Sequence, residues 1–196
     1  MPTQEEFEKK ARRFPTLEPT RDRFYDMALN LLRDGYEIEA YILFLATWNF
    51  AGFRYVLTQF NLDSFRKTIS EINPVFARLS HQNFRDASFE DARLCEDIEE
   101  IYAKLREVVK QTGAVKIMHL RNPNLFVMWD TGIRSIFKIK NRASPEDYIS
   151  FLKKMKKEFG SIRWEDRERT FAKAIDQYNY VEEADKKKLK EARHGN

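Results

Sequence analysis

Cysteine, glycine and proline are scarce in this chain of 196 residues. Its single cysteine, Cys95, excludes a disulfide framework and a zinc site built on cysteine ligands. The three histidines, His81, His119 and His194, are too far apart in sequence to follow a metal-ligand spacing, so no metal site is expected. Six glycines and six prolines are too few for a turn-rich β-sandwich or a disordered chain.

A long hydrophobic run is also missing. The most apolar stretch, residues 40–56, is interrupted by Asn49 and Arg54, which favours a buried core helix over a membrane span. The first thirty residues contain no apolar segment typical of a signal peptide. We therefore expect a soluble, cytoplasmic protein with no membrane partner. The many charged residues and the single cysteine are also typical of thermophilic proteins.

Several well-known catalytic motifs are absent as well. The chain has no P-loop, no dinucleotide-binding fingerprint, no H-E-x-x-H zinc motif and no G-x-S-x-G nucleophile elbow. The enzyme classes that depend on these motifs are therefore disfavoured.

Positive charge is concentrated in the last third of the chain. Residues 134–196 contain 17 Lys and Arg against 11 Asp and Glu, whereas residues 1–133 contain 18 against 20. Most of the surplus falls between Arg134 and Lys157. A one-sided basic patch of this kind indicates a surface that binds phosphate groups, such as those of a nucleic acid. The alternative interpretation is a solvated helix face in a lysine-rich chain.

Helix start and stop signals cover almost the whole sequence. Ser88 and Asp91 begin a long helix whose apolar residues follow a spacing of three and four until Gly113. Gly35 is expected to end an earlier helix, and Pro74 to end or kink another. No segment alternates apolar and polar residues as a strand would. The sequence therefore predicts an all-α fold of about nine or ten helices.

The C-terminal end is predicted to stand apart. Two helical stretches are expected there, roughly over 163–179 and 182–193. We expect residues 1–180 to form a single helical domain of one or two lobes. Residues 181–196 are expected to form a charged C-terminal helix or tail.

The most informative segment covers residues 112–134, TGAVKIMHLRNPNLFVMWDTGIR. A short helix is predicted from Val115 to Arg121, with Lys116 in its first turn, followed by a near-extended apolar return. A helix of seven residues is about 10 Å long, a distance that the return can cover, so Asp130 can end beside Lys116. A helix N-terminus and burial both lower the pKa of an ammonium group, and a neutral amine forms Schiff bases. Asp130 would then serve as a base or stabilise a sugar cation.

This pattern resembles the core of the helix-hairpin-helix DNA glycosylase superfamily, in particular the lyase-type enzymes that excise 8-oxoguanine. The resemblance implies an orthogonal array of helices with a helix-hairpin-helix near residues 89–121. It also implies that Lys116 is the nucleophile and that Asp130 caps the following helix. It requires no cofactor. The chain departs from the family pattern because its hairpin has one glycine, Gly113, and its second helix is short.

Other residues are candidates for binding. Trp48 and Asn49 interrupt the most apolar helix and could stack on and read a base, although a core tryptophan with an asparagine that satisfies the backbone near Gly52 is the favoured interpretation. His119 lies one turn after Lys116, either lining the same cleft or buried with its hydrogen bonds satisfied. Trp129 is a stacking platform or a core residue. Arg134, Lys138 and Lys140 are candidates for contact with the DNA backbone.

Taken together, the residues and the resemblance predict a DNA repair glycosylase and AP lyase that acts on an oxidised purine through a lysine Schiff base. A non-catalytic helical module that binds nucleic acid or protein on the same scaffold remains the alternative. A helical interaction subunit without nucleic acid is a third hypothesis. Strand cleavage separates the first from the second, and DNA binding at low salt separates the second from the third.

Overall fold

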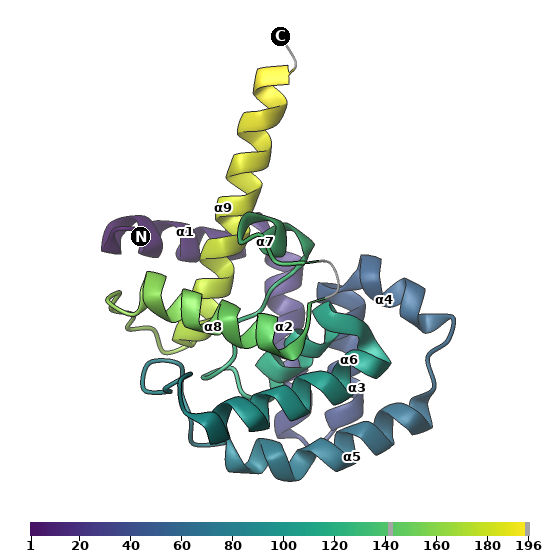
Figure 1. Cartoon of the computed structure of the whole chain (residues 1–196). Helices are drawn as coiled ribbons and strands as arrows, with labels where there is room; N and C mark the ends of the chain where they lie inside the picture. The colour runs from purple at the N-terminus through teal and green to yellow at the C-terminus, as the bar shows by residue number, and fades with distance from the viewer. Residues whose placement is uncertain (141–142, 195–196) are drawn as a thin grey trace.

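The computed structural model describes the backbone of residues 1–140 and 143–194, and the side chains of these residues up to 192. This part of the chain contains nine α-helices and no strand, as the sequence predicted (Figure 1). The helices are α1 (Gln4–Leu17), α2 (Pro19–Arg33), α3 (Glu37–Trp48), α4 (Phe50–Leu57), α5 (Leu62–Arg78), α6 (Ala92–Arg121), α7 (Thr131–Ile136), α8 (Pro145–Phe159) and α9 (Phe171–His194). None of the helices described is both long and apolar enough to cross a membrane.

The longest helix, α6, lies at the centre of the fold and packs against α3, α4, α5 and α8. Its backbone leaves the helical region at Lys110, where φ is 62° and ψ is 174°, so α6 consists of two helical segments joined at a kink. The second segment carries a nearly continuous run of buried residues from Gly113 to Leu120. This burial fixes the segment firmly in the core.

The expected position of this break was wrong. The sequence placed it at Gly113, three residues after its position in the structure. Gly113 belongs to the second segment, where a side-chain β-carbon would lie 2.9 Å from Cβ of Val109. The glycine thus permits the chain to pack closely against the residue just before the break, and does not end the helix. As a consequence, Lys116 lies in the second turn after the break and not in the first.

Two further helix boundaries were open or differ from the prediction. Of the two expected effects of Pro74, an end of the helix is excluded, because α5 continues through Pro74 to Arg78 while Ile72, Val75 and Phe76 pack into the core on both sides of the proline. Tertiary packing here outweighs the local preference against proline. At the other end of the chain, the two expected helical stretches form one helix, α9, and the segment from 163 to 170 is not helical.

The C-terminal helix, α9, begins in the core and ends in solvent. Its first residues are buried as far as Val181, and residues 186–192 are exposed. Figure 1 shows the end of α9 extending away from the other helices. The domain boundary expected at residue 180 therefore falls inside an unbroken helix. The buried part of α9 packs against α1 and α7, and brings polar side chains toward the second segment of α6.

Candidate functional site

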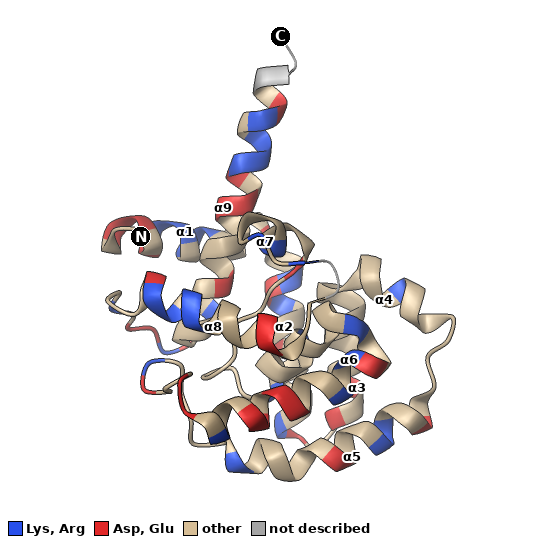
Figure 2. Cartoon of the chain, in the orientation of Figure 1, with Lys and Arg blue, Asp and Glu red and all other residues tan. Residues whose placement is uncertain are grey.

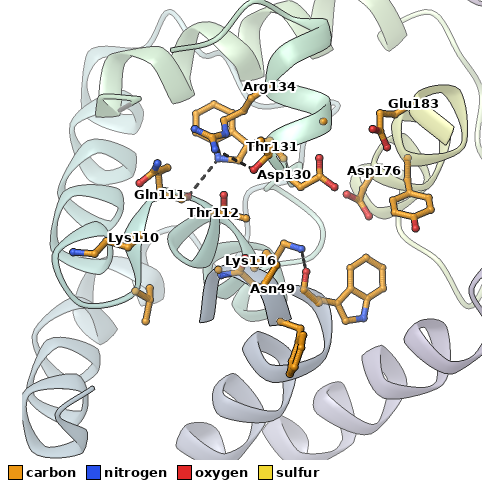
Figure 3. Close-up of a pocket in the computed structure, with 18 of the residues that line it drawn as sticks. Asn49, Lys110, Gln111, Thr112, Lys116, Asp130, Thr131, Arg134, Asp176 and Glu183 are labelled. Carbon is orange, nitrogen blue, oxygen red and sulfur yellow. Dashed lines mark hydrogen bonds between the residues drawn. The ribbon is translucent and has the colours of Figure 1, made fainter. Parts of the chain in front are cut away.

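A cleft of about 510 Å³ opens where four parts of the chain meet. Its walls come from the junction of α3 and α4, the break in α6, the residues around the start of α7, and the buried part of α9, with Arg21 of α2 at its edge. The side chains of Lys116 and Asp130 both line it, although they come from different elements (Figure 3). The structure thus brings together the two residues that the sequence selected for catalysis.

Lys116 is held at the buried end of the cleft. Only 5% of the residue is exposed. Its amine donates a hydrogen bond to the carbonyl oxygen of Trp48, at the end of α3, and lies 5.6 Å from the centroid of the Trp48 ring. Among the residues described, no carboxylate oxygen lies within 4.0 Å of this amine, which is the distance that defines an ion pair. Lys116 is therefore a buried amine without a direct counterion.

This environment disfavours the charged form of Lys116. Burial lowers its pKa from the usual 10.5 to about 8, even though the negative charges of Asp130 and Asp176 act in the opposite direction. The positive charges of Arg21 and Lys173 add to the lowering. A lysine with this pKa carries an appreciable fraction of neutral, nucleophilic amine near neutral pH. Desolvation produces this effect, whereas the sequence had also invoked the helix N-terminus.

Asp130 has the structural role that the sequence predicted for it. It is the N-cap of α7, and its Oδ1 accepts a hydrogen bond of 2.8 Å from the backbone N–H of Ile133. The residue is only half-buried, and its charge acts on Lys116 across the cleft. The cap fixes the orientation of the carboxylate while one oxygen retains unused acceptor capacity. Asp130 can therefore serve as a cap and also present a negative charge to the cleft.

Two more carboxylates reach the same cleft from α9, and the sequence analysis missed both. Asp176 is buried, and Glu183 is half-buried. Figure 3 shows the carboxylates of Asp130, Asp176 and Glu183 gathered on one side of the cleft, above Lys116. Burial and the charge of Asp130 raise the pKa of Glu183. The sequence did contain a signal for Asp176, because polar residues stand at positions 173, 176 and 177 among the apolar residues of α9. This signal can be interpreted only when the helix is known to be buried.

Tyr180 of α9 lines the cleft beside these carboxylates. Its hydroxyl donates to Glu18 and accepts a hydrogen bond of 3.1 Å from the guanidinium of Arg21. Burial raises the pKa of Tyr180 to about 12, so its hydroxyl stays protonated at neutral pH. The ring is thus held in place by α1–α2 residues at the rim of the cleft.

His119, one turn after Lys116, does not line this cleft. It is fully buried, with Nδ1 2.6 Å from the carbonyl oxygen of Phe126 and Nε2 3.0 Å from the hydroxyl of Tyr25. A carbonyl only accepts, so Nδ1 donates and Nε2 accepts from the tyrosine. Burial and the charge of Lys173 lower the pKa of His119 to about 3. The satisfied core histidine is therefore the correct interpretation of this residue.

Trp48 is a core residue that also lines the cleft, where its backbone carbonyl oxygen accepts the hydrogen bond from Lys116. Its ring stacks on Phe14 with centroids 5.5 Å apart, and its Nε1 donates to the carbonyl oxygen of Arg21 at 2.9 Å. Asn49 lies at the junction of α3 and α4 and lines the cleft. Its side chain packs over Gly52, where an added β-carbon would come within 2.7 Å of the amide oxygen. Reading of a base by either residue stays a prediction.

Trp129 and Arg134 are both buried. Trp129 packs edge-to-face against Tyr148 at 5.0 Å, and its Nε1 donates to the carbonyl oxygen of Gln111 at 3.3 Å. The guanidinium of Arg134 donates to the carbonyl oxygen of Lys140 at 3.3 Å and to Thr131 Oγ1 at 3.4 Å. Trp129 therefore anchors the residues just after the α6 break. Arg134 ties the start of α7 to the chain beyond it, although it also lines the cleft.

Figure 2 shows basic residues of the run between residues 134 and 157 on α8. Only part of this run is available for a ligand. Lys153 pairs with Glu90 at 2.7 Å, and Lys156 donates to the carbonyl oxygen of Ala87. Arg142 lies outside the described residues. The exposed lysines of the run are Lys138, Lys140, Lys154 and Lys157. A phosphate-binding role for these residues stays a prediction.

No group of three or more metal-ligating side chains is found in the part of the chain that the structure describes. Comparison with known proteins adds no further constraint. No protein-family model matches the chain, and neither a curated protein nor a solved structure is detectably similar to it. The function must therefore be argued from the geometry of this cleft.

Proposed function

We propose that this protein is a DNA glycosylase with AP-lyase activity that acts on a damaged purine, such as an oxidised one, in double-stranded DNA. The observation that carries the proposal is the position of Lys116. It is a buried amine with a pKa of about 8, without a direct counterion among the described residues, in a cleft that it shares with Asp130. Structural lysines are rarely placed in this way, because burying an unpaired ammonium is costly.

The proposed reaction uses the lone pair of the neutral Lys116 amine. The amine forms a bond to C1′ of the damaged nucleotide while the N-glycosidic bond breaks. The departing base takes the electron pair of that bond and a proton, and the lysine nitrogen gives up a proton. The nitrogen lone pair then forms the iminium as the C1′–O4′ bond breaks, and O4′ takes a proton from water to become a hydroxyl. Loss of a proton from C2′ expels the 3′-phosphate, which cleaves the strand.

Asp130 would act on the positive charge that develops at C1′. Its carboxylate is held by the N–H of Ile133 and faces the cleft that contains Lys116. A preorganised negative charge in a partly buried site stabilises a cationic transition state without moving. This role requires no metal and no organic cofactor.

The dimensions of the cleft agree with a substrate that enters from a duplex. A volume of about 510 Å³ lies within the range typical of pockets for small ligands, which suits a single nucleotide flipped out of the helix. The exposed lysines of the basic run, Lys138, Lys140, Lys154 and Lys157, would contribute contacts with phosphates. Base preference would depend on the cleft walls around Asn49 and Tyr180.

Borohydride trapping tests the proposal. The wild-type protein and Lys116→Ala are incubated with duplexes that contain an abasic site or 8-oxoguanine, and borohydride reduces any iminium to a stable adduct. We expect an adduct with the wild type on both duplexes and none with the variant. Lys110→Ala is a matched control, because Lys110 lines the same cleft at the break in α6.

Three other outcomes would change the assignment. An adduct on the abasic duplex alone would leave a lyase without glycosylase activity on this lesion. Salt-dependent DNA binding without any adduct would favour the non-catalytic binding module. Absence of both binding and adduct at low salt would favour a helical interaction protein.

A further inference from the structure

A second buried lysine lies behind the cleft. Lys173, in the first turn of α9, is fully buried. Its amine lies over three aromatic rings, with 3.7 Å to the centroid of Trp48, 4.6 Å to that of Tyr25 and 5.0 Å to that of Phe14. These contacts are close enough for cation–π attraction, which helps to keep an ammonium group in an apolar core. Nothing in the proposed reaction uses this residue directly.

Lys173 has a carboxylate partner, and that partner is a cleft residue. Its amine lies 3.0 Å from Oδ2 of Asp176, one turn along α9. Asp176 also lines the cleft and acts electrostatically on Lys116. Both amines also contact Trp48, because Lys116 donates to its carbonyl oxygen and Lys173 packs on its ring. One carboxylate is therefore available to two buried lysines, and only Lys173 forms the direct ion pair.

We propose that Lys173 is a positioning residue for Lys116: by holding Asp176 in a direct ion pair, it leaves the Lys116 amine without a carboxylate partner and therefore nucleophilic. This inference rests on the proposed function, since it matters only if Lys116 is the nucleophile. Lys173 itself does not touch the substrate. It acts through Asp176 and through the repulsion between the two amines.

The charged groups that face each lysine also predict that Lys173 favours the neutral form of Lys116. Lys116 faces Asp130 beside α7, Asp176 and Lys173 of α9, and Arg21 of α2. Lys173 faces Asp176 on its own helix, Asp22 of α2, and Arg169 in the segment before α9. Replacing Lys173 by a neutral residue removes a repulsive charge and frees Asp176 to attract the Lys116 ammonium. Both changes favour the protonated form of Lys116.

The test is a titration of the Lys116 side chain without DNA. The whole protein is produced with 13Cε-labelled lysine, and the resonance that disappears in Lys116→Arg is assigned to Lys116. Its chemical shift is then followed against pH in the wild type, Lys173→Met, Lys173→Arg and the double variant Lys173→Met/Asp176→Asn. Methionine preserves the length of the side chain and packs well against aromatic rings, so Lys173→Met is expected to fold.

We expect the titration midpoint of Lys116 to rise by about one pH unit in Lys173→Met, which corresponds to a tenfold change in its proton affinity. Lys173→Arg should stay close to the wild type, because the ion pair is retained. The double variant should return to the wild-type midpoint or fall below it, because the freed carboxylate is gone. A merely structural role for Lys173 would alter stability and leave the midpoint in place.

An unchanged or lower midpoint in Lys173→Met would overturn the inference, as would a double variant that stays at the raised value. Because this titration uses no DNA, it stands apart from the trapping experiment. If Lys116 forms no adduct but its midpoint responds as expected, the proposed function fails and the electrostatic arrangement stands. If Lys116 traps DNA but its midpoint does not respond, only the role of Lys173 fails.

Discussion

Lys116 and His119 lie one turn apart on the same buried helix segment, yet the hydrogen bonding and the surroundings of the two side chains differ. Both ring nitrogens of His119 are hydrogen-bonded, to Tyr25 and to Phe126. Lys116 has three donors when charged, and among the described residues its amine forms one hydrogen bond, to the carbonyl oxygen of Trp48. His119 faces the core, and Lys116 faces a cleft. Burial alone therefore does not select a candidate for a reactive group, whereas burial with unused hydrogen-bonding capacity beside a cleft does.

The largest effect on the reaction is expected when the charge of Asp130 is removed, because Asp130 lines the cleft that Lys116 faces and His119 does not. Asparagine is an equally good N-cap, so Asp130→Asn should preserve α7 while it abolishes the negative charge in the cleft. We expect base excision in a single-turnover assay to slow by roughly 10²–10³-fold, the size typical of a group that stabilises charge in a transition state. The temperature of unfolding should change little.

This variant also distinguishes two roles for Asp130, because they predict opposite signs. Asp130 raises the pKa of Lys116, so its removal increases the fraction of neutral amine near neutral pH. If Asp130 acted only on Lys116, the reaction at pH 7 would therefore become faster. Asp91→Asn is the matched control, since Asp91 caps α6 with a similar hydrogen bond, 2.9 Å from its Oδ1 to Leu94 N.

The pH dependence of adduct formation is the second test. Because the pKa of Lys116 is lowered to about 8, the rate of trapping on an abasic duplex should rise roughly tenfold between pH 7 and pH 9 and then level off. An ordinary exposed lysine, with a pKa near 10.5, would show a rate that still climbs at pH 10. A rate independent of pH over this range would contradict the lowered pKa.

Replacement of His119 is expected to have the smallest effect on the reaction and a clear effect on the stability of the fold. Its pKa in the folded state is lowered to about 3, against about 6.5 in the unfolded chain, so only the unfolded state binds the proton between these values. The stability that neutral His119 contributes is present above pH 6.5 and is lost as pH falls, by about 1.4 kcal/mol per pH unit at most.

Urea unfolding of the wild type and His119→Gln at several pH values measures this contribution. Glutamine is neutral throughout, so the variant should be less stable than the wild type at pH 7 by about 1–3 kcal/mol, and the difference should shrink toward pH 4. The amount of Lys116 adduct per folded molecule should not change. A difference in stability that stays constant with pH would mean that His119 binds its proton over the same pH range in the folded and the unfolded state, which contradicts a lowered pKa.

The sequence predicted the all-α class and allowed Asp130 to end near Lys116, and in the structure both side chains line the same cleft. Helix punctuation and apolar spacing are local signals, and the 13 residues between Lys116 and Asp130 cover most of a short helix and a return of similar length. Asp130 was predictable as a cap because capping depends on a neighbouring N–H. These features require no knowledge of distant segments.

The remaining parts of the site depend on contacts between distant segments. Asp176 and Glu183 enter the cleft from α9, more than forty residues after Asp130, and no local pattern places them there. The break at Lys110 has no glycine or proline to mark it, and the glycine that misled the prediction serves close packing with Val109. The lowered pKa of Lys116 likewise arises from burial by Trp48 and its neighbours, which only the folded chain provides.

The most direct test of the account is to locate the trapped bond. The wild-type protein is reduced with borohydride in the presence of an abasic duplex, digested with nuclease and protease, and analysed by peptide mass spectrometry. We predict that the sugar remnant is attached to Lys116. Attachment to the N-terminal amine or to an exposed lysine such as Lys138 or Lys140, with Lys116 unmodified, would contradict the assignment of Lys116 as the nucleophile.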